Sequence, residues 1–185
     1  APNGERILMH ASNFRRIKRV QDVVHIFHNV CKEIPSKLLF VGDGPERATA
    51  EELSRQLGVG DDIRFVGKQE QMEDILAIAD LFLLTSEYES FGLAALEAMA
   101  AGVPVVSTNA GGLGEIMIPG VTGFMGNVGD VETMSKQAID ILKDEQRLNK
   151  FKQNAAEHAL NFDIHNIVPQ YEKLYDEVLS KELVH

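Results

Sequence analysis

The chain has 185 residues, of which 44% are hydrophobic and 25% charged, a composition typical of a globular domain with a substantial core. The net charge of −10 argues against nucleic acid or an anionic membrane as the main partner, and no apolar run is long enough to span a bilayer. A single cysteine, Cys31, leaves no internal disulfide and suits a small core residue. Since the start also lacks a signal-peptide pattern, we expect a cytoplasmic protein.

An apolar run at residues 6–12 (RILMHAS) predicts the first strand. The loop behind it, residues 13–19 (NFRRIKR), is the only dense basic cluster of this acidic chain. In a doubly wound sheet, the carboxyl end of the first strand is where a diphosphate would bind. We therefore expect Lys18 and at least one of Arg15 and Arg16 to contact phosphate, with a solvated basic loop as the alternative.

A helix is predicted over residues 20–34 because apolar side chains recur at helical spacing. The members of this stripe are Val20, Val23, Val24, Phe27, Val30 and Ile34. His25 and His28 lie three residues apart on the same helix, but no third metal ligand is apparent. We interpret these two histidines as surface or boundary residues.

The apolar run at residues 36–41 predicts a second strand, covered on both faces of the sheet. It ends in the tight turn Gly42-Asp43-Gly44-Pro45. This turn is not a dinucleotide-binding fingerprint, because Arg47 stands where the third glycine would be.

The next part of the chain alternates helix, strand and helix. A helix is predicted over residues 48–57, a strand over 63–66 and a second helix over 70–79. The loop between the last two carries Lys68.

Residues 81–102 (LFLLTSEYESFGLAALEAMAAG) are the segment on which the functional prediction depends. An apolar strand is predicted at 81–85, a polar loop at 86–90 and a helix of strong helix formers at 93–101. A helix that starts just beyond a parallel strand presents free N–H groups and a positive dipole end at the edge of the sheet. Such a helix start favours phosphate binding.

Two carboxylates bracket this helix start. Glu89 lies in the loop before it, and Glu97 lies one turn inside it. The backbone amides of Phe91, Gly92 and Leu93 lie between the two carboxylates and suit an anion, and Gly92 lets a ligand approach the backbone closely. Since carboxylates accept hydrogen bonds from hydroxyl groups, the combination predicts a nucleotide-sugar site.

A strand at residues 103–107, a glycine-rich turn at 109–115 and a short strand at 121–124 complete the predicted sheet. Strands that alternate with helices imply parallel pairing, so we expect one doubly wound α/β domain over residues 1–185. Residues 130–185 are predicted to be a helical tail packed on this domain. The last of its apolar stripes consists of Ile167, Tyr171, Leu174 and Val178.

The segment Glu89-SFGLAAL-Glu97 resembles the E-x7-E motif of retaining glycosyltransferases of the GT-B fold, the family that includes sucrose and glycogen synthases. The turn at 42–45 is similar to a turn beside the nucleotide in that family, and the turn at 109–115 to its G-G-x-P-E turn, with Gly114 in place of the proline. The resemblance implies that this chain is the C-terminal, Rossmann-like, donor-binding half of such an enzyme. We expect the N-terminal acceptor domain to be absent and the isolated chain to be inactive.

The resemblance also implies roles for individual residues. Glu97 is expected to bind the ribose hydroxyls, and the amides of residues 91–93 are expected to bind the sugar and the diphosphate. Glu89, Lys18 and Arg15 are the candidate catalytic residues: Glu89 holds the hexose, and the two cations neutralise charge on the leaving UDP.

Further contacts are implied around the nucleotide. Gly42 and Lys68 are expected to lie beside it. Many members of the family carry an arginine where this chain has Asn13, so Asn13, Arg15 or Arg16 is left to meet the diphosphate. No metal or other cofactor is expected.

The stretches SNFRRIKRVQDVV, VGDGPE and SEYESFGLAALEAMA show a closer likeness to one group within this family. That likeness implies transfer of N-acetylglucosamine from UDP-N-acetylglucosamine to L-malate, in bacillithiol biosynthesis. The alternatives are another UDP-sugar transferase, a UDP-N-acetylglucosamine 2-epimerase or a non-catalytic nucleotide-sugar binding module. A homo-oligomer is compatible with the sequence.

Overall fold

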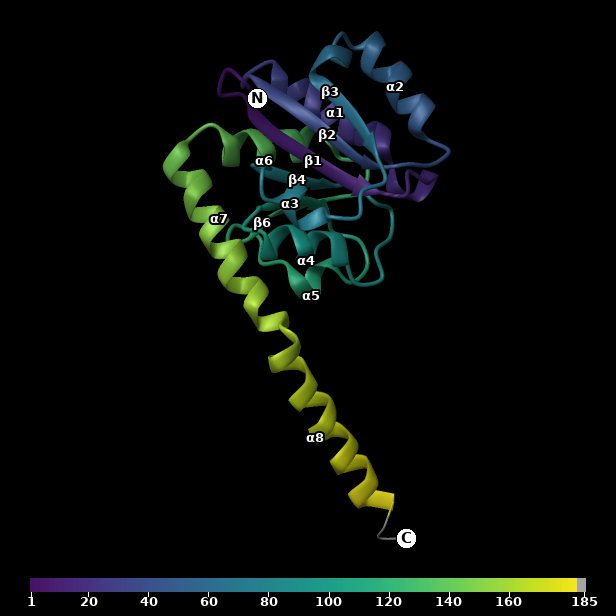
Figure 1. Cartoon of the computed structure of the whole chain (residues 1–185), viewed down its shortest axis with the longest axis vertical. Helices are drawn as coiled ribbons and strands as arrows, with labels where there is room; N and C mark the ends of the chain where they lie inside the picture. Colours follow the sequence, from purple (N-terminus) through teal and green to yellow (C-terminus); the bar gives the residue numbers. More distant parts are fainter. Residues whose placement is uncertain (183–185) are drawn as a thin grey trace.

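Six short parallel strands form the sheet around which the chain folds (Figure 1). The computed structural model describes residues 1–182. Its strands are β1 (Arg6–Ser12), β2 (Ser36–Gly42), β3 (Ile63–Gly67), β4 (Leu81–Leu84), β5 (Val105–Thr108) and β6 (Gly123–Gly126). Every neighbouring pair of strands is parallel, which confirms the predicted doubly wound α/β fold.

The strand order β3-β2-β1-β4-β5-β6 places β1 beside β4 in the middle of the sheet. The chain runs outward from β1 to β3, returns to lie beside β1 as β4, and then runs outward in the other direction. Because the connections diverge at this point, they leave a crevice at the carboxyl ends of β1 and β4. The predicted phosphate-binding loop and the E-x7-E segment both begin at this edge.

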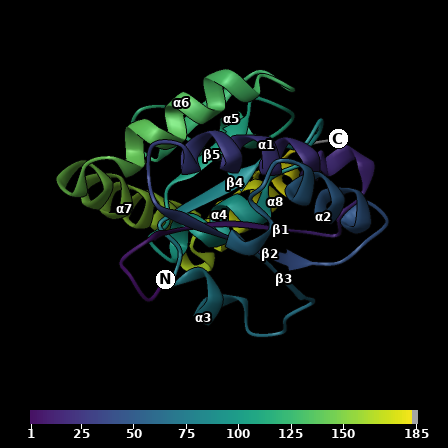
Figure 2. The same cartoon turned by 90° about the horizontal axis from the view of Figure 1, so that it is seen from above.

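Helices cover both faces of the sheet. They are α1 (Val20–Cys31), α2 (Arg47–Gln56), α3 (Met72–Leu76), α4 (Leu93–Ala100), α5 (Leu113–Ile116), α6 (Val131–Leu142), α7 (Glu145–Ala159) and α8 (Ile164–Glu182). The connections within residues 1–182 contain three 3-10 turns: η1 (Arg16–Lys18), η2 (Gly60–Asp62) and η3 (Leu160–Phe162). Seen from above, α1 and α6 lie on one side of the sheet and α3 on the other (Figure 2).

The alternation of side chains along each strand divides the core in two. In β4, Leu81 and Leu83 belong to a core shared with α1 and α6, whereas Phe82 and Leu84 belong to a core shared with α4 and α5. All four side chains are buried, which explains why β4 reads as an uninterrupted apolar run.

Two helices are shorter than predicted. The first helix ends at Cys31 rather than at Ile34, because the following Pro35 disfavours helical geometry in the residue before it. Helix α3 ends at Leu76 because the chain must reach Asp80, which lies just before β4 and pairs with Ile7 of β1. The Asp80 N–H donates to the Ile7 carbonyl at 2.7 Å, and the Asp80 carboxylate accepts from the Ile7 N–H at 3.0 Å.

The helical tail differs from the prediction in its last helix. Helix α7 packs on the domain: Phe151 joins one core and Ala155 the other. Helix α8, in contrast, extends away from the sheet (Figure 1), and Tyr171 and Leu174 of its apolar stripe are more than half exposed. The expectation that the whole tail packs on the domain is therefore wrong for α8, whose stripe borders an open groove beside α4 instead of packing into the core. Within residues 1–182, no helix combines the length and apolar character needed to cross a membrane.

Candidate functional site

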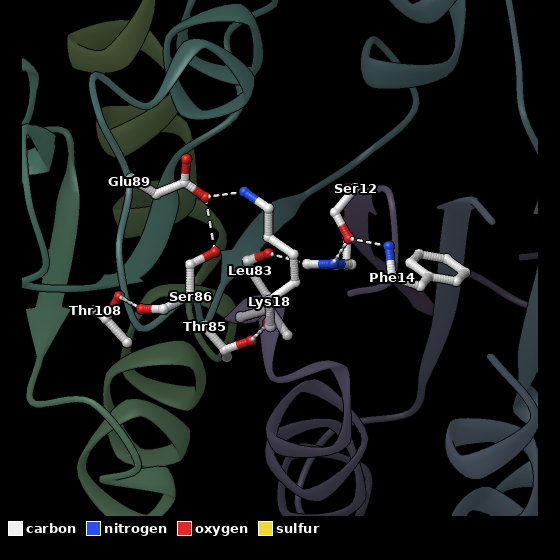
Figure 3. Close-up of polar contacts among 9 residues, drawn as sticks. Ser12, Phe14, Lys18, Leu83, Thr85, Ser86, Glu89 and Thr108 are labelled. Carbon is white, nitrogen blue, oxygen red and sulfur yellow. Dashed lines mark hydrogen bonds and ion pairs between the residues drawn. The ribbon is translucent and has the colours of Figure 1, made fainter. Parts of the chain in front are cut away.

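The loop after β1 is anchored by Phe14, whose side chain is fully buried. Phe14 has a left-handed φ of 37°, and its ring centroid lies 5.5 Å from that of Phe40 and 6.4 Å from that of Phe65. The Phe14 N–H donates to the Ser12 hydroxyl at 3.2 Å (Figure 3). With Phe14 turned into the core, its neighbour Asn13 remains exposed on the loop.

A buried histidine supports this loop from within β1. His10 Nδ1 lies 2.9 Å from the Leu83 carbonyl oxygen, and Nε2 lies 2.8 Å from the Ser12 hydroxyl. A carbonyl can only accept, so Nδ1 carries the proton and Nε2 accepts from Ser12. Complete burial lowers the pKa of His10 from 6.5 to about 4; Lys18 adds to this effect, while the Leu83 hydrogen bond and Glu89 oppose it. The ring is therefore neutral at pH 7.

Side-chain and backbone hydrogen bonds tie the loop after β1 to the loop after β4. The Thr85 hydroxyl lies 2.9 Å from the Lys18 carbonyl oxygen (Figure 3). It also lies 3.0 Å from the Arg19 carbonyl oxygen. Arg19 has a left-handed φ of 47°, an unfavourable conformation that these contacts help to hold. The Glu87 N–H donates to the Ile17 carbonyl at 2.8 Å.

The two loops meet in an ion pair between predicted catalytic residues. Lys18 Nζ lies 2.5 Å from Glu89 Oε1, and the Ser86 hydroxyl donates to the same oxygen at 2.7 Å (Figure 3). The Lys18 side chain is 20% exposed and the Glu89 side chain 13%. A cation and a carboxylate are thus held at the mouth of the crevice, where a ligand can reach both.

Helix α4 begins at the same place. Gly92 precedes it with a φ of 96°, and a Cβ atom there would lie 2.5 Å from Leu113 Cδ2. Glycine is therefore required by both the backbone conformation and the packing of α5. Among the described residues, no side chain caps the start of α4 at Leu93, so the first amides of the helix are available to an anionic ligand.

The predicted glycine-rich turn supports this loop from behind. A Cβ atom on Gly111 would lie 1.9 Å from the Glu89 carbonyl oxygen, and one on Gly112 would lie 2.5 Å from that of Ser90. The Gly112 N–H donates to the Glu89 carbonyl at 2.8 Å. Backbone-to-backbone packing therefore fixes the position from which the Glu89 side chain extends.

A cavity of about 300 Å³ opens between these segments. The predicted site residues that line it are Asn13, Lys18, Glu89, Phe91, Gly92 and Leu93. Of the residues left open for the diphosphate, Asn13 therefore faces the cavity, whereas Arg15 and Arg16 are exposed residues outside its lining.

Four predicted site residues do not line the cavity. Arg15, Lys68 and Glu97 are exposed, just before η1, on the loop after β3 and on α4, respectively. Gly42 ends β2 against the loop after β1, where a Cβ atom would lie 1.8 Å from the Ser12 carbonyl oxygen. Its proximity to the site is therefore explained by packing between the two strand ends.

Sequence reasoning missed the buried polar residues around the cavity. His10, Thr85, Ser86 and Thr108 are all fully buried, and each lies within or just after an apolar strand. A polar side chain in such a run is a signal that it has a specific partner, but the sequence does not say which.

A larger groove of about 920 Å³ lies between α4 and α8 and shares Phe91 and Leu93 with the cavity. Its other walls include Phe162 and Ile167, so its character is mainly apolar and does not suit a diphosphate. Among residues 1–182, no group of three or more His, Cys, Asp or Glu side chains is arranged to hold a metal ion.

Comparison with known proteins identifies the family to which this chain belongs. A profile of the family "Glycosyl transferases group 1" matches residues 1–158. The chain is 47% identical over 179 residues to N-acetyl-alpha-D-glucosaminyl L-malate synthase of Bacillus anthracis, covering 96% of this chain and 47% of that protein. It is 32% identical over 164 residues to 2-deoxystreptamine N-acetyl-D-glucosaminyltransferase of Niallia circulans, covering 84% of this chain and 41% of that protein. The chain therefore spans less than half of each relative.

Solved structures agree with the fold. Sucrose-phosphate synthase from Thermosynechococcus elongatus superimposes with a TM-score of 0.85 at 28% identity, over 98% of this chain and 47% of that one. Anabaena Alr3699/HepE, solved in complex with UDP, gives a TM-score of 0.85 at 25% identity, over 94% of this chain and 49% of that one.

The buried His10 predicts a stability that falls in acid. Because the pKa of His10 is about 4 in the folded state and 6.5 when unfolded, the unfolded chain binds more protons between these values. Stabilisation by the neutral ring is complete above pH 6.5 and is lost as the pH falls toward 4, by about 3 kcal/mol. In urea unfolding from pH 7.5 to 4.5, His10→Gln should show a flatter pH dependence than the wild type. The exposed control His165→Gln should keep the wild-type slope; equal slopes in all three proteins would contradict this assignment.

Two alanine substitutions in the glycine-rich turn are expected to differ in their effect on the free energy of unfolding. Gly111→Ala should lower the free energy of unfolding by about 2 kcal/mol or more, because φ is +62° and the new Cβ atom meets the Glu89 carbonyl. In Gly114→Ala, within helix α5, the new Cβ atom meets nothing within 4 Å, so the change should be neutral or stabilising by up to about 1 kcal/mol. Urea denaturation of both variants measures the difference, and similar losses from the two would show that the contact between Gly111 and Glu89 is unimportant.

Proposed function

Since the chain belongs to the glycosyl transferases group 1 family, we propose that it binds the nucleotide-sugar donor in the crevice at the carboxyl ends of β1 and β4. The observation that carries this proposal is the cavity in which Lys18, Glu89 and the start of α4 meet. A cation and free amides bind phosphate, and a carboxylate accepts hydrogen bonds from sugar hydroxyls. Both kinds of group are needed by a ligand in which a diphosphate is joined to a hexose.

The donor in this proposal is UDP-N-acetylglucosamine and the acceptor is L-malate, as in bacillithiol biosynthesis. The support is the 47% identity to a protein named for that reaction, which extends over nearly the whole chain. The acceptor would be held by a second domain, because the chain spans less than half of that relative. A complete active site therefore needs groups beyond those described for this chain.

The chemistry assigned to the chain is stabilisation of the leaving group. During transfer, the bond between the anomeric carbon and the diphosphate oxygen breaks, and UDP leaves with the electron pair. Negative charge grows on the diphosphate, where the Lys18 ammonium and the first amides of α4 can stabilise it. The acceptor hydroxyl oxygen bonds to the same face of the sugar while its O–H bond breaks and the proton passes to an oxygen of the leaving diphosphate, so the anomeric configuration is retained. The proposal includes no metal or other cofactor.

Donor binding requires the pair between Lys18 and Glu89 to rearrange. In the structure, the two side chains bind each other at 2.5 Å. Because both side chains retain some exposure at the cavity, the more highly charged diphosphate can reach Lys18 and compete with Glu89 for it. Lys18 then neutralises the phosphates while Glu89 accepts hydrogen bonds from the hexose hydroxyls, so the two residues bind neighbouring parts of the donor.

A second candidate keeps the donor sugar and changes the acceptor. It is favoured by the 32% identity to a 2-deoxystreptamine N-acetyl-D-glucosaminyltransferase. Both candidate functions require the cavity to bind the same donor sugar, and they differ only in the acceptor domain.

A ligand titration tests the donor class. A ligand that binds only the folded chain raises its unfolding temperature, so UDP and UDP-N-acetylglucosamine should each produce a concentration-dependent shift. ADP, GDP and NAD at equal concentrations serve as matched controls and should produce smaller shifts. A shift with ADP or NAD that exceeds the one with UDP would contradict the proposed donor.

The ribose role of Glu97 gives a second prediction. Glu97 follows the cavity residue Leu93 by four positions, so both lie on the same face of α4, and Glu97 is exposed to a ligand there. Glu97→Ala should weaken UDP binding by about 1–3 kcal/mol, because the ribose hydroxyls lose their acceptor. Calorimetry measures the affinity, with Glu157→Ala on α7 as an exposed control. Unchanged affinity in Glu97→Ala would remove Glu97 from the site.

A further inference from the structure

Three buried hydroxyl groups lie at the carboxyl ends of neighbouring strands. Thr85 and Ser86 follow directly after β4, and Thr108 is the last residue of β5. All three side chains are fully buried, so each must find a hydrogen-bond partner inside the protein. Their partners all belong to the loops that form the cavity (Figure 3).

Ser86 has the most direct link to the site. Its hydroxyl donates to Glu89 Oε1 at 2.7 Å, the same oxygen that Lys18 Nζ approaches to 2.5 Å. Within the described part of the chain, no hydrogen bond engages Glu89 Oε2, which points away from both donors (Figure 3). One carboxylate oxygen is therefore committed to the protein, and the other is left for a ligand.

Ser86 is itself held in place. The Thr108 hydroxyl donates to the Ser86 carbonyl at 2.6 Å, and this bond joins the end of β5 to the end of β4. On the other side, the Gly112 N–H holds the Glu89 carbonyl at 2.8 Å. The donor hydroxyl and the backbone of its acceptor are thus both fixed to the second half of the sheet.

The two donors to Glu89 Oε1 differ in what they can do when a ligand arrives. Lys18 lines the cavity and carries the positive charge that a diphosphate attracts. Ser86 is fully buried and is not part of the cavity wall, so its hydroxyl has no access to phosphate. Once Lys18 turns to the diphosphate, Ser86 is the donor that still holds Glu89 Oε1.

We propose that Ser86 is a positioning residue that fixes the Glu89 carboxylate so that Oε2 faces the hexose of the donor. This inference rests on the proposed function of the cavity. Ser86 touches neither the nucleotide nor the sugar, and it acts only through Glu89. Its contribution should therefore appear in the recognition of the sugar and be absent from the recognition of UDP.

The test compares the affinities of this chain for UDP and for UDP-N-acetylglucosamine by calorimetry. Ser86→Ala should leave the affinity for UDP within about twofold of the wild type and weaken UDP-N-acetylglucosamine by roughly 5- to 10-fold, because the unheld carboxylate loses its orientation. Ser86→Thr keeps the hydroxyl and should retain the preference for the sugar nucleotide. Ser107→Ala is the matched control: Ser107 is equally buried at the end of β5, but its hydroxyl bonds to the Thr108 carbonyl and Met117 sulfur rather than to the site.

A double variant separates positioning from a general effect on folding. If Ser86 acts through Glu89, then Ser86→Ala combined with Glu89→Gln should bind UDP-N-acetylglucosamine no more weakly than Glu89→Gln alone. Should Ser86→Ala unfold, Ser86→Cys takes its place, since a thiol is similar in shape and a much weaker donor.

The outcomes distinguish this inference from the function on which it rests. Failure of the wild type to bind either ligand would overturn the proposed function. Binding by the wild type together with unchanged sugar preference in Ser86→Ala would overturn the positioning role alone. Equal losses for UDP and UDP-N-acetylglucosamine would also overturn it, because they would indicate a distorted cavity.

Discussion

The pairing of β1 with β4 brings the two loops of the candidate site together. Met9 of β1 lies opposite Phe82 of β4 although two other strands come between them in the sequence, and the connections on either side of this pair leave in opposite directions. The basic loop and the E-x7-E segment are thereby brought to one edge. The contacts between the two loops follow from this adjacency, including the pair between Lys18 and Glu89. A sheet with the same strands in another order would separate the two residues.

Buried hydroxyl groups make this edge rigid without filling it. A side chain that must satisfy its own hydrogen bond inside the protein also fixes whatever it bonds to. Thr85 holds the turn that carries Lys18, and Ser86 holds the Glu89 carboxylate. The loop after β1 is held in the same way by Phe14 and by the neutral His10. The charged groups can therefore exchange partners with a ligand while the backbone beneath them stays in place.

Two observations agree with the proposal that the chain is a donor-binding half that works with another domain. It covers less than half of its relatives, and the apolar stripe of α8 is exposed beside the groove at the start of α4. The groove shares Phe91 with the proposed donor cavity, so whatever covers it would also border the site. This arrangement agrees with a proposal in which donor recognition belongs to this chain and acceptor recognition lies elsewhere.

Most local elements, and the resemblance to the family, could be predicted from the sequence. The strand at Arg6–Ser12 and the start of α4 at Leu93 were predicted at the residues where they occur, because alternating or continuous apolar runs and strong helix formers are local signals. Spacing also placed Glu89 and the start of α4 at one edge. Which side chains meet at that edge could be seen only in the folded chain. The hydrogen bond from Thr85 to the Lys18 carbonyl joins residues 67 positions apart, and the one from Thr108 to the Ser86 carbonyl joins residues 22 positions apart. Both bonds depend on the order of the strands in the sheet, which no local sequence pattern predicts. The same holds for α8: its periodic stripe predicts an apolar face, but whether that face is covered depends on a surface that periodicity cannot describe.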